Sequence, residues 1–211
     1  MACEESQAVT IELRKLGHEA YSCDVLDCSG GHPEWHLKQD VIPLLNQQWD
    51  IIIAFPPCTY LSNAGACRLY RKGVINEERY KKGLEAKEFF MKFYNAACDK
   101  IAIENPISLK VFDLPPYTQQ IEPYMFGEPY TKKTRLWLKG LPKLEPTDLV
   151  EPVGPWCPSG TGRKNRKAYG AAPRGNDAVN RAKTFKGIAK AMALQWAGDI
   201  TKRGEINTNN I

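Results

Sequence analysis

Short apolar runs that end at proline or at polar residues predict the strands of this chain. Residues 51–55 form such a run, which stops at two prolines, and residues 101–106, Ile-Ala-Ile-Glu-Asn-Pro, form another predicted strand, which stops at its proline. Apolar runs of this length without alternation are typical of strands buried in a parallel sheet. Residues 20–25 and 135–139 are predicted as two further strands.

Apolar residues at helical spacing lie between and after these predicted strands. A first helix is expected from Ser6, as N-cap, to a stop at Gly17. Residues 41–45 predict a short helical stretch, residues 76–98 a long amphipathic helix and residues 178–196 a last helix. Because strands and helices alternate, the pattern predicts an α/β fold with a parallel sheet.

The chain of 211 residues predicts one domain with a full hydrophobic core. Residues 1–140 are predicted to form this core. Residues 141–175 are rich in proline, glycine and basic side chains, which favours an irregular excursion. Residues 176–200 are expected to return as a helix that packs on the core, and residues 201–211 as a disordered tail.

The composition, 43% hydrophobic and 25% charged, is ordinary for a soluble protein. No apolar run reaches the length of a membrane span and no signal-peptide pattern opens the chain, so we expect a cytoplasmic protein. The seven cysteines form no C-x-x-C pair, which indicates reduced thiols and no metal site. We interpret His32 and His36 as residues of an exposed loop. The net charge of +5 permits a polyanionic partner.

Cys58 is the first candidate for chemistry. It follows a predicted buried strand and two prolines, at the strand end where open α/β sheets bind their ligands. The prolines restrict the loop, which suits a nucleophile that must be aimed. Glu104 and Arg135 also lie at strand edges. Each residue also has a purely structural interpretation: Cys58 as a buried thiol, Glu104 as a capping or solvated carboxylate, and Arg135 as a surface residue of a strand.

Three segments, in the same order, resemble motifs of the DNA cytosine-C5 methyltransferases. Residues 50–62 resemble the Pro-Cys catalytic motif, and residues 103–106 are similar to the Glu-Asn-Val motif. Residues 127–140 are similar to the Gln-x-Arg-x-Arg block, with Lys133 and Arg135 at the two arginine positions. The chain also resembles small, phage-type members of this family.

The resemblance implies a class I, Rossmann-like sheet with helices on both faces and a covalent mechanism. Cys58 would add as a thiolate to C6 of cytosine, which makes C5 nucleophilic. Glu104 would hold or deliver a proton at N3, and Arg135 would hydrogen-bond O2, with Lys133 beside it. The C5 proton would then leave and Cys58 would be released.

The resemblance also implies a cofactor and a partner. S-Adenosylmethionine would donate the methyl group, with Asp24 on its ribose, Asp40 facing its adenine, and Glu4 and Pro56 completing the site. A cytosine in duplex DNA must be flipped out, so a basic surface must bind the backbone. The candidates for this surface are Arg68, Arg71, Lys72, Arg163, Lys164, Arg166 and Lys167. The structural alternative for these residues is a solvated charged loop.

The chain departs from the family pattern in three places. Residues 2–7 contain no glycine where the family has a glycine-rich loop. The N-terminal strand is expected to be truncated, with residues 1–3 as a stub. Only residues 141–175 are available for target recognition, so the protein should contact few base edges.

Two other functions remain open. The same thiolate chemistry could act on a free pyrimidine nucleotide, or the fold could bind nucleic acid or nucleotide without catalysis. DNA binding that weakens with salt would separate the first hypothesis from the nucleotide enzyme. An adduct through Cys58 would separate both enzymes from a binding protein. The sequence does not determine the oligomeric state.

Overall fold

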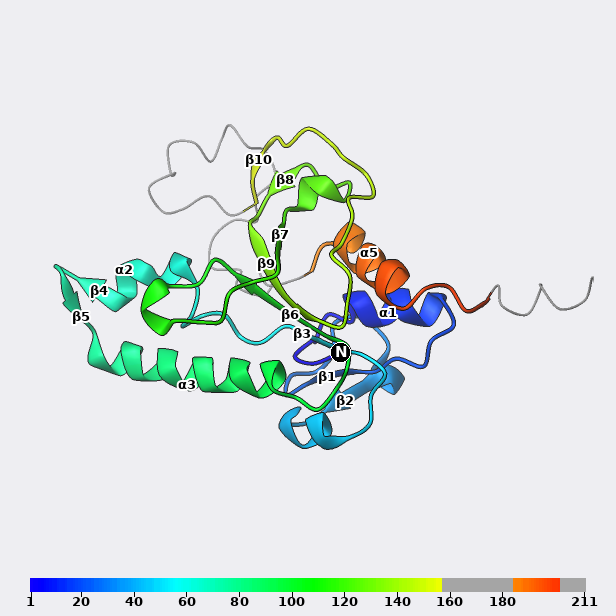
Figure 1. Cartoon of the computed structure of the whole chain (residues 1–211), viewed down its shortest axis with the longest axis horizontal. Coiled ribbons are helices and arrows are strands. Elements are labelled where there is room, and N and C mark those ends of the chain that lie inside the picture. The colour runs from blue at the N-terminus through cyan, green and yellow to red at the C-terminus, as the bar shows by residue number, and fades with distance from the viewer. Residues whose placement is uncertain (157–183, 202–211) are drawn as a thin grey trace, which may run out of the picture.

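The computed structural model describes residues 1–156 and 184–201, which form an α/β structure (Figure 1). The helices are α1 Ala8–Lys15, α2 Ala66–Leu69, α3 Glu77–Tyr94 and α5 Lys186–Trp196. The strands are β1 Ser22–Asp24, β2 His36–Lys38, β3 Ile52–Ala54, β4 Tyr70–Arg71, β5 Val74–Ile75, β6 Ile101–Pro106, β7 Gln119–Ile121, β8 Tyr130–Thr131, β9 Thr134–Lys139 and β10 Gly154–Pro155.

Ala2 joins two pieces of sheet. The larger piece has the order β3-β6-β9-β7, and the smaller one pairs β1 with β2. Ala2 forms parallel bridges to Cys23 in β1 and to Ala54 in β3. Its N–H donates to the Ile53 carbonyl at 2.8 Å, and its carbonyl accepts from the Phe55 N–H at 2.9 Å. The expected stub is therefore the link in the order β2-β1-Ala2-β3-β6-β9-β7.

The sheet is mixed, so the prediction of a wholly parallel sheet is wrong at one edge. β2, β1, Ala2, β3 and β6 run parallel to one another, whereas β9 is antiparallel to both β6 and β7. A parallel return needs a long crossover, usually a helix. Between β6 and β9 the chain has only single turns of 3₁₀ helix, at Lys110–Phe112 and Pro123–Met125, which leaves the antiparallel connection.

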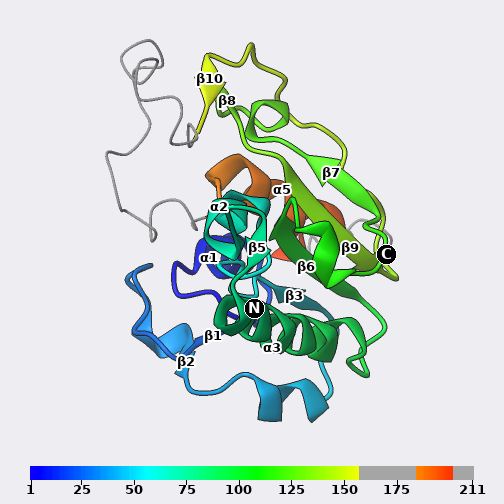
Figure 2. The same cartoon turned by 90° about the vertical axis from the view of Figure 1, so that its left-hand side faces the viewer.

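Helices cover both faces of the sheet (Figures 1 and 2). Ile52 and Ala54 belong to the same buried cluster as Phe90 and Phe93 of α3. Ile53, between them, belongs to the cluster that contains α1 and α5 residues. Successive strand residues point to opposite faces, so one short apolar run serves two cores.

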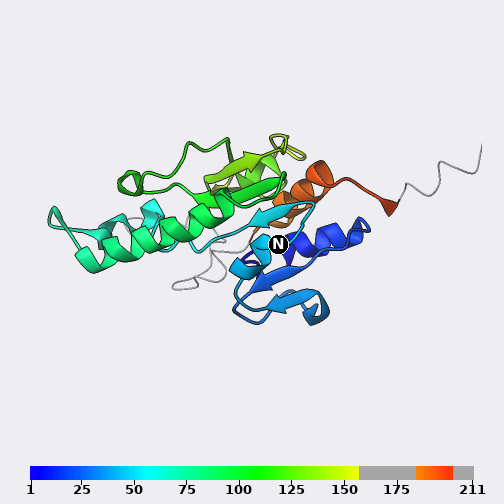
Figure 3. The same cartoon turned by 60° about the horizontal axis from the view of Figure 1, so that its bottom comes forward.

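The predicted elements begin and end close to where the sequence indicates. α3 starts after Asn76, whose Oδ1 accepts the Arg79 N–H at 2.9 Å, which is the expected N-cap geometry. The predicted stretch 41–45 is a 3₁₀ helix, Ile42–Asn46. α5 lies inside the range expected for the last helix and packs beside α1 (Figure 3). Of the expected tail, residues 201–211, all but the first residue lie outside the described residues.

The start of α1 differs from the prediction. Ser6 is not its N-cap; Gln7 takes that position with a left-handed backbone, φ 57°, and its side chain makes no capping bond. The Glu4 carboxylate takes over the capping. It accepts from the Val9 N–H at 2.6 Å, the Thr10 N–H at 3.3 Å and the Thr10 hydroxyl at 2.6 Å. These are free donors of the first helical turn.

Candidate active site

The carboxyl ends of the parallel strands meet at one edge of the sheet. The stub leads to β1 and β2 on one side, and β3 and β6 lie on its other side. From Ala2 the chain adds its next strands, β1 and β2, on one side of the sheet, and then adds β3 and β6 on the other side, so the order of strands reverses between Ala2 and β3. In open parallel sheets, ligands bind beyond the carboxyl ends of the strands at such a reversal. The loops after Ala2 and after β3 border this place.

The loop that contains Cys58 is tied to the segment that follows β6. The Cys58 carbonyl accepts from the Ser62 N–H at 2.8 Å, which closes the turn. The Asn63 N–H donates to Ile107, and the Leu109 N–H donates to Leu61, both at 2.8 Å. These bonds hold the Cys58 loop beside the chain that leaves Glu104. As the sequence predicts, Cys58 and Glu104 lie at the same edge of the sheet: Cys58 follows β3, and Glu104 lies in the neighbouring parallel strand β6, just past the last residue paired with β3.

Pro56 and Pro57 behave differently in this loop. Pro56 is buried, Pro57 is exposed, and Cys58 keeps part of its surface. The buried proline fixes the loop against the core, while the next residues reach the surface. The Cys58 thiol therefore lies in a loop that reaches the surface, and the buried Pro56 anchors this loop to the core.

Glu104 faces the side of the sheet that α1 and α5 cover. It lies opposite Leu136, which belongs to the α1 and α5 cluster. Burial of its carboxyl group raises the pKa of Glu104, and the charge of Lys132 partly opposes this rise. Glu104 therefore keeps its proton to a higher pH than a carboxyl group in water.

Arg135 lies on the opposite face of the sheet from Glu104. Its partners across the strands are Asn105 and Gln120, and its guanidinium lies 4.3 Å from the centre of the Tyr117 ring. Its Nε is buried without a hydrogen-bond partner. The register of β9 thus separates Arg135 from Glu104, and the expected pair is not brought together.

Lys132 is the cation that the sequence reasoning missed. Its charge acts on Glu104, and its Nζ lies 5.7 Å from the centre of the Phe185 ring. The neighbouring Lys133, the expected residue, is exposed. Two adjacent lysines cannot be distinguished by type. Only the register of β9, which places alternate residues on alternate faces, gives a signal for Lys132.

Asp24 ends β1 and Asp40 follows β2, and the charges of both act on Cys3, which follows Ala2. Burial, followed by the charges of Asp24, the Cys23 thiol and Asp40, raises the pKa of the Cys3 thiol to about 12. Each aspartate uses Oδ1 to accept a backbone N–H two residues on, Leu26 for Asp24 and Ile42 for Asp40, both at 3.0 Å.

The surroundings of Asp24 combine a polar and an apolar part. Val25 is 68% exposed and Leu26 is 58% exposed, so two apolar side chains follow the carboxylate at the surface. Glu4 does not join Asp24 and Asp40. It is 3% exposed, its oxygens are used at α1, and burial raises its pKa despite the nearby N-terminal amine.

The loop after the stub has glycine-like backbone angles without glycine. Cys3 and Gln7 have φ of 56° and 57°, in the left-handed region that non-glycine residues rarely adopt. Gln7 is fully buried; its Nε2 donates to the His32 carbonyl at 2.7 Å, and its Oε1 accepts the His32 N–H at 3.1 Å. A Cβ on Gly30 would lie 2.6 Å from that of Gln7, so only glycine fits over this loop.

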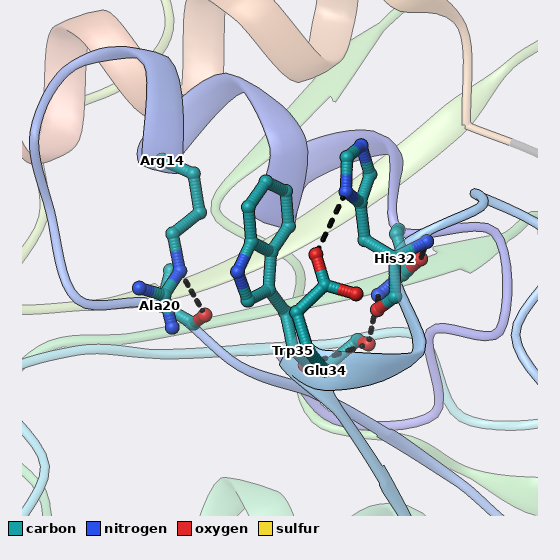
Figure 4. Close-up of polar contacts among 7 residues, drawn as sticks. Arg14, Ala20, His32, Glu34 and Trp35 are labelled. Atoms are coloured by element: carbon teal, nitrogen blue, oxygen red, sulfur yellow. Dashed lines mark hydrogen bonds and ion pairs between the residues drawn. The ribbon is translucent and has the colours of Figure 1, made fainter.

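A stack of side chains holds the segment that covers the loop (Figure 4). The His32 and Trp35 rings are stacked, with centroids 3.9 Å apart. His32 Nδ1 lies 3.1 Å from Glu34 Oε1, and the Arg14 guanidinium lies 5.3 Å from the Trp35 ring on its other side. Arg14 also donates to the Ala20 carbonyl at 2.8 Å, so α1 is joined to this segment.

The basic residues after Cys58 belong to a small folded unit. Arg68 lies in α2, Arg71 ends β4 and Lys72 opens the turn to β5, where a loop was expected. All three are exposed. The other candidates for DNA contact, Arg163, Lys164, Arg166 and Lys167, lie outside the described residues.

A cavity of about 330 Å³ lies at the other edge of the sheet, where the strands begin. Its lining includes Met1, Tyr21, Val41, Trp49 and Ile51, and none of the expected catalytic or cofactor residues. Within the described ranges, no group of three or more His, Cys, Asp or Glu side chains could hold a metal ion. No described helix is both long and apolar enough to cross a membrane.

Comparisons with protein-family models, with curated proteins and with solved structures each gave no match.

Proposed function

We propose that the protein transfers a methyl group from S-adenosylmethionine to C5 of cytosine in DNA. The observation that supports this best is the position of Cys58 and Glu104. Cys58 follows β3, Glu104 lies in the neighbouring parallel strand β6 just past the last residue paired with β3, and hydrogen bonds between the segments after the two strands hold this edge together. A thiol and a carboxyl group that keeps its proton to a higher pH than usual, at the same edge of the sheet, supply the nucleophile and the acid that addition to a pyrimidine ring requires.

Cys58 and Glu104 have complementary tasks in this reaction. The Cys58 thiolate forms a bond to C6, and the electron pair of the C5–C6 double bond becomes available at C5. Glu104 donates its proton or a hydrogen bond at N3, which makes C6 electrophilic. Its raised pKa supports this role, because the carboxyl group must be protonated near neutral pH. After methyl transfer, loss of the C5 proton restores the double bond and releases the Cys58 thiolate.

Lys132 takes over the place that the sequence suggests for Arg135. A cation near O2 stabilises the charge that builds up on the ring. Lys132 lies where its charge acts on Glu104, whereas Arg135 is on the other face and stacks on Tyr117.

Asp24 and Asp40 fit an S-adenosylmethionine site. Each has a carboxylate oxygen beyond the one used in its turn, and each lies at the carboxyl end of a strand. Asp24 would accept from ribose hydroxyls and Asp40 from the adenine amine, with Val25 and Leu26 as apolar surface for the base. When bound, the cofactor supplies the methyl group. Glu4 is left out of this proposal because its carboxylate caps α1.

The strand order supports the finer, Rossmann-like assignment. Numbered along the chain, the stub is first, β1 second, β2 third, β3 fourth and β6 fifth. The spatial order is therefore 3-2-1-4-5, as in doubly wound nucleotide-binding sheets. In such sheets the first and fourth strands border the ligand, and here the loops after them contain the left-handed residues and Cys58.

A trapping experiment tests the proposed function. The protein is incubated with S-adenosylmethionine and duplex DNA containing 5-fluorocytosine, which cannot lose a proton from C5. Mass spectrometry should detect a protein–DNA adduct through Cys58 that carries one added methyl group. Cys58→Ser should give no adduct, and Glu104→Gln should slow its formation by about 10²-fold or more.

Three results would change the assignment. An adduct that forms only with a free fluorinated pyrimidine nucleotide would indicate a nucleotide-modifying enzyme. Binding of DNA without an adduct in the folded protein would indicate a binding protein. An adduct at another cysteine, such as the exposed Cys67, would exclude Cys58 as the nucleophile.

A further inference from the structure

We propose that Tyr130, Trp156 and Phe185 form a stacking platform for unpaired bases, and that the preferred substrate is single-stranded rather than duplex DNA. This inference rests on the proposed function, because it names the form of DNA on which the proposed site acts. We call these three residues the aromatic platform. The bases of a duplex stack on one another, whereas the bases of a single strand can stack on side chains.

The aromatic platform is assembled from three separate segments of the chain. Tyr130 begins β8, Trp156 follows β10, and Phe185 is the N-cap residue of α5. β8 and β10 pair side by side (Figure 1), and the Trp156 N–H donates to the Thr131 carbonyl at 3.0 Å. The Trp156 ring centre lies 4.9 Å from that of Tyr130 and 5.0 Å from that of Phe185, with interplanar angles of 62° and 71°. Tertiary contacts thus hold three ring faces together in different orientations.

The three rings are not used as core residues. All of them are only half-buried, Tyr130 and Trp156 are outside both buried clusters, and Phe185 packs at the border of one cluster. Nε1 of Trp156 is buried without a hydrogen-bond partner among the described residues. Because a buried indole N–H normally has a partner, this donor indicates that the platform is completed by a ligand with an acceptor group, as every base has.

The aromatic platform begins beside the groups proposed to act on the target cytosine. Lys132 Nζ lies 5.7 Å from the centre of the Phe185 ring, and the charge of the same lysine acts on Glu104. A base on the platform is therefore close to a cytosine held at Glu104. The two bases can belong to neighbouring nucleotides of one strand.

Cations flank the aromatic platform. Lys133 and Lys186 are exposed, and neither forms an ion pair with another described residue. The acidic residue closest to the platform in the chain, Glu128, is half-buried and accepts the Gly187 N–H at 2.8 Å. Proteins that bind single strands combine cations for the backbone with aromatic rings for the bases. The surface around Lys132 has both.

The energy of unstacking explains why the platform favours single strands. A base in a duplex must lose its pairing and its stacking before a protein can bind it, and this loss costs free energy. A base in a single strand pays little of this cost and gains a stacking partner on the platform. The platform therefore adds to the affinity for a single strand and adds little for an intact duplex.

The first test compares the two forms of DNA. The protein is incubated with S-adenosylmethionine and a single strand of about 20 nucleotides that contains 5-fluorocytosine, or with the same strand annealed to its complement. Mass spectrometry follows the adduct through Cys58. The adduct should form at least about tenfold faster on the single strand. Formation at the same rate on the duplex, or a faster rate there, overturns the inference.

The second test separates stacking from packing. Leucine fills space but has no ring face, so Trp156→Leu and Phe185→Leu should each weaken binding of the single strand about tenfold in fluorescence anisotropy. Trp156→Phe and Phe185→Tyr keep a ring and should stay within about threefold of the wild type. Thermal unfolding confirms that each variant is folded. Equal binding by the leucine variants and the aromatic variants would mean that the rings only pack.

Altered DNA gives the matching change in the partner. Replacing the bases next to the target by abasic sugars should weaken binding by the wild type about tenfold and hardly affect Trp156→Leu, which has already lost the stacking contact. Independent losses in the wild type and in Trp156→Leu would show that these bases do not lie on the platform, and would overturn the inference.

Matched controls separate rings from charges. Lys133→Ala and Lys186→Ala should lower the salt slope of binding by about 0.7 each, while the ring variants should leave the slope unchanged. Tyr94→Leu and Lys92→Ala remove an exposed ring and an exposed lysine of α3 and should alter neither the affinity nor the slope. A loss of affinity in Tyr94→Leu as large as in Trp156→Leu would reject a specific platform.

The platform and the proposed methyl transfer can fail separately. Cys58→Ser should bind the single strand as tightly as the wild type, since stacking does not use the thiol. Ring-dependent binding of single strands without any adduct would keep the platform as a binding site and reject the transfer reaction. An adduct that forms equally well on duplex DNA and does not depend on the rings would reject the platform and keep the reaction.

Discussion

Glu104 has a carboxyl group whose environment favours the neutral form. The pKa of this group is raised above its ordinary value of 4.5 mainly by burial, with Lys132 acting in the opposite direction. A raised pKa in the folded state means that protonation stabilises the fold. This stabilisation is complete below pH 4.5 and is lost as the pH rises through the pKa of the folded protein. The raised pKa that suits Glu104 for proton donation therefore lowers the stability of the fold once the pH is high enough to ionise this carboxyl group.

Glu104→Gln should remove this cost. Glutamine has nearly the same shape and never ionises, so the variant should unfold at the same temperature as the wild type near pH 4 and at a higher temperature at pH 7–8. Thermal unfolding from pH 4 to pH 8 measures the difference. The exposed Glu85→Gln on α3 serves as the control and should show no such crossover. A Glu104→Gln variant that is less stable at every pH would contradict the assigned environment.

Lys132→Met should move the same transition in a defined direction. Without the nearby positive charge, the pKa of Glu104 should rise further, because the remaining cause is burial alone. The pH range in which the protein loses stability should then shift upward relative to the wild type. Lys133→Met, one residue on and exposed, should leave the range where it is. Equal shifts in both variants would mean that Lys132 has no special relation to Glu104.

Gln7 combines an unfavourable backbone angle with favourable side-chain bonds. Its left-handed φ costs about 1–2 kcal/mol in a non-glycine residue, and its amide group satisfies both the N–H and the carbonyl of His32. Gln7→Ala keeps the strain and loses the bonds, so stability should fall by about 2–3 kcal/mol. Gln7→Gly loses the same bonds and relieves the strain. Urea unfolding should place Gln7→Gly between Gln7→Ala and the wild type; the reverse order would show that the backbone angle costs nothing.

At the level of elements, α3 depends on a close approach to the turn after β6. Gly83 is buried in the middle of this helix, and a Cβ there would lie 2.0 Å from Cζ of Phe112. Glycine normally weakens a helix by about 1 kcal/mol relative to alanine. Here the missing Cβ makes room for a ring that is 1% exposed, so packing outweighs propensity.

Gly83→Ala should therefore destabilise the protein, although it improves helix propensity. Overpacking of this kind costs about 1–3 kcal/mol, which exceeds the gain from alanine. The double variant Gly83→Ala with Phe112→Leu should be less destabilised than the sum of the two single variants, because the smaller side chain gives the Cβ its space. A double-mutant cycle by urea unfolding measures this coupling. Additive effects would place the strain elsewhere in α3.

The sequence predicts elements well where local chemistry determines them. β6 has the predicted bounds because its apolar run ends at a proline, and α3 starts just after Asn76, the first residue of its predicted range. β7 is missed because two of its three residues are glutamines, and only pairing with β9 makes it a strand. The β4–β5 hairpin is missed because its turn begins with a lysine rather than with asparagine or a first glycine.

The site is predictable to the same extent. Cys58 and Glu104 follow apolar runs that any reader of the chain can find, and parallel pairing of β3 with β6 brings them to one edge. Arg135 lies in β9 and Lys132 just before it, and their positions differ by an odd number of residues, so they lie on opposite faces of the sheet. Which of the two faces Glu104 shares depends on the register of β9 with β6. Glu4 looked free to bind a ligand, but a helix start without a capping side chain took its carboxylate. Register and capping are tertiary effects, and no local pattern encodes them.

At the scale of the whole molecule, one residue connects the two parts that any cofactor and base would have to share. Asp24 and Asp40 lie on the β1–β2 side, Cys58 and Glu104 lie on the β3–β6 side, and Ala2 forms the bridge between them. The Ala2 N–H donates to Ile53, and the Cys23 N–H donates to Met1. The Glu4 N–H also donates to Cys23, and buried side chains of both sides share one cluster, so backbone bonds of residues 1–4 and core packing together hold the two sides.

Ala2→Pro tests this dependence directly. Proline has no N–H, so the bond to the Ile53 carbonyl is lost and the two sides should separate more easily. Hydrogen exchange followed by mass spectrometry should show faster exchange at the amides of Cys23 and Phe55, which donate to Met1 and Ala2. The amides of β9, paired on both sides by β6 and β7, should keep their protection. Ala2→Gly keeps the N–H and is the matched control. Equal loss of protection across β9 in Ala2→Pro would mean that the sheet unfolds as one unit and that the stub is not a separate joint.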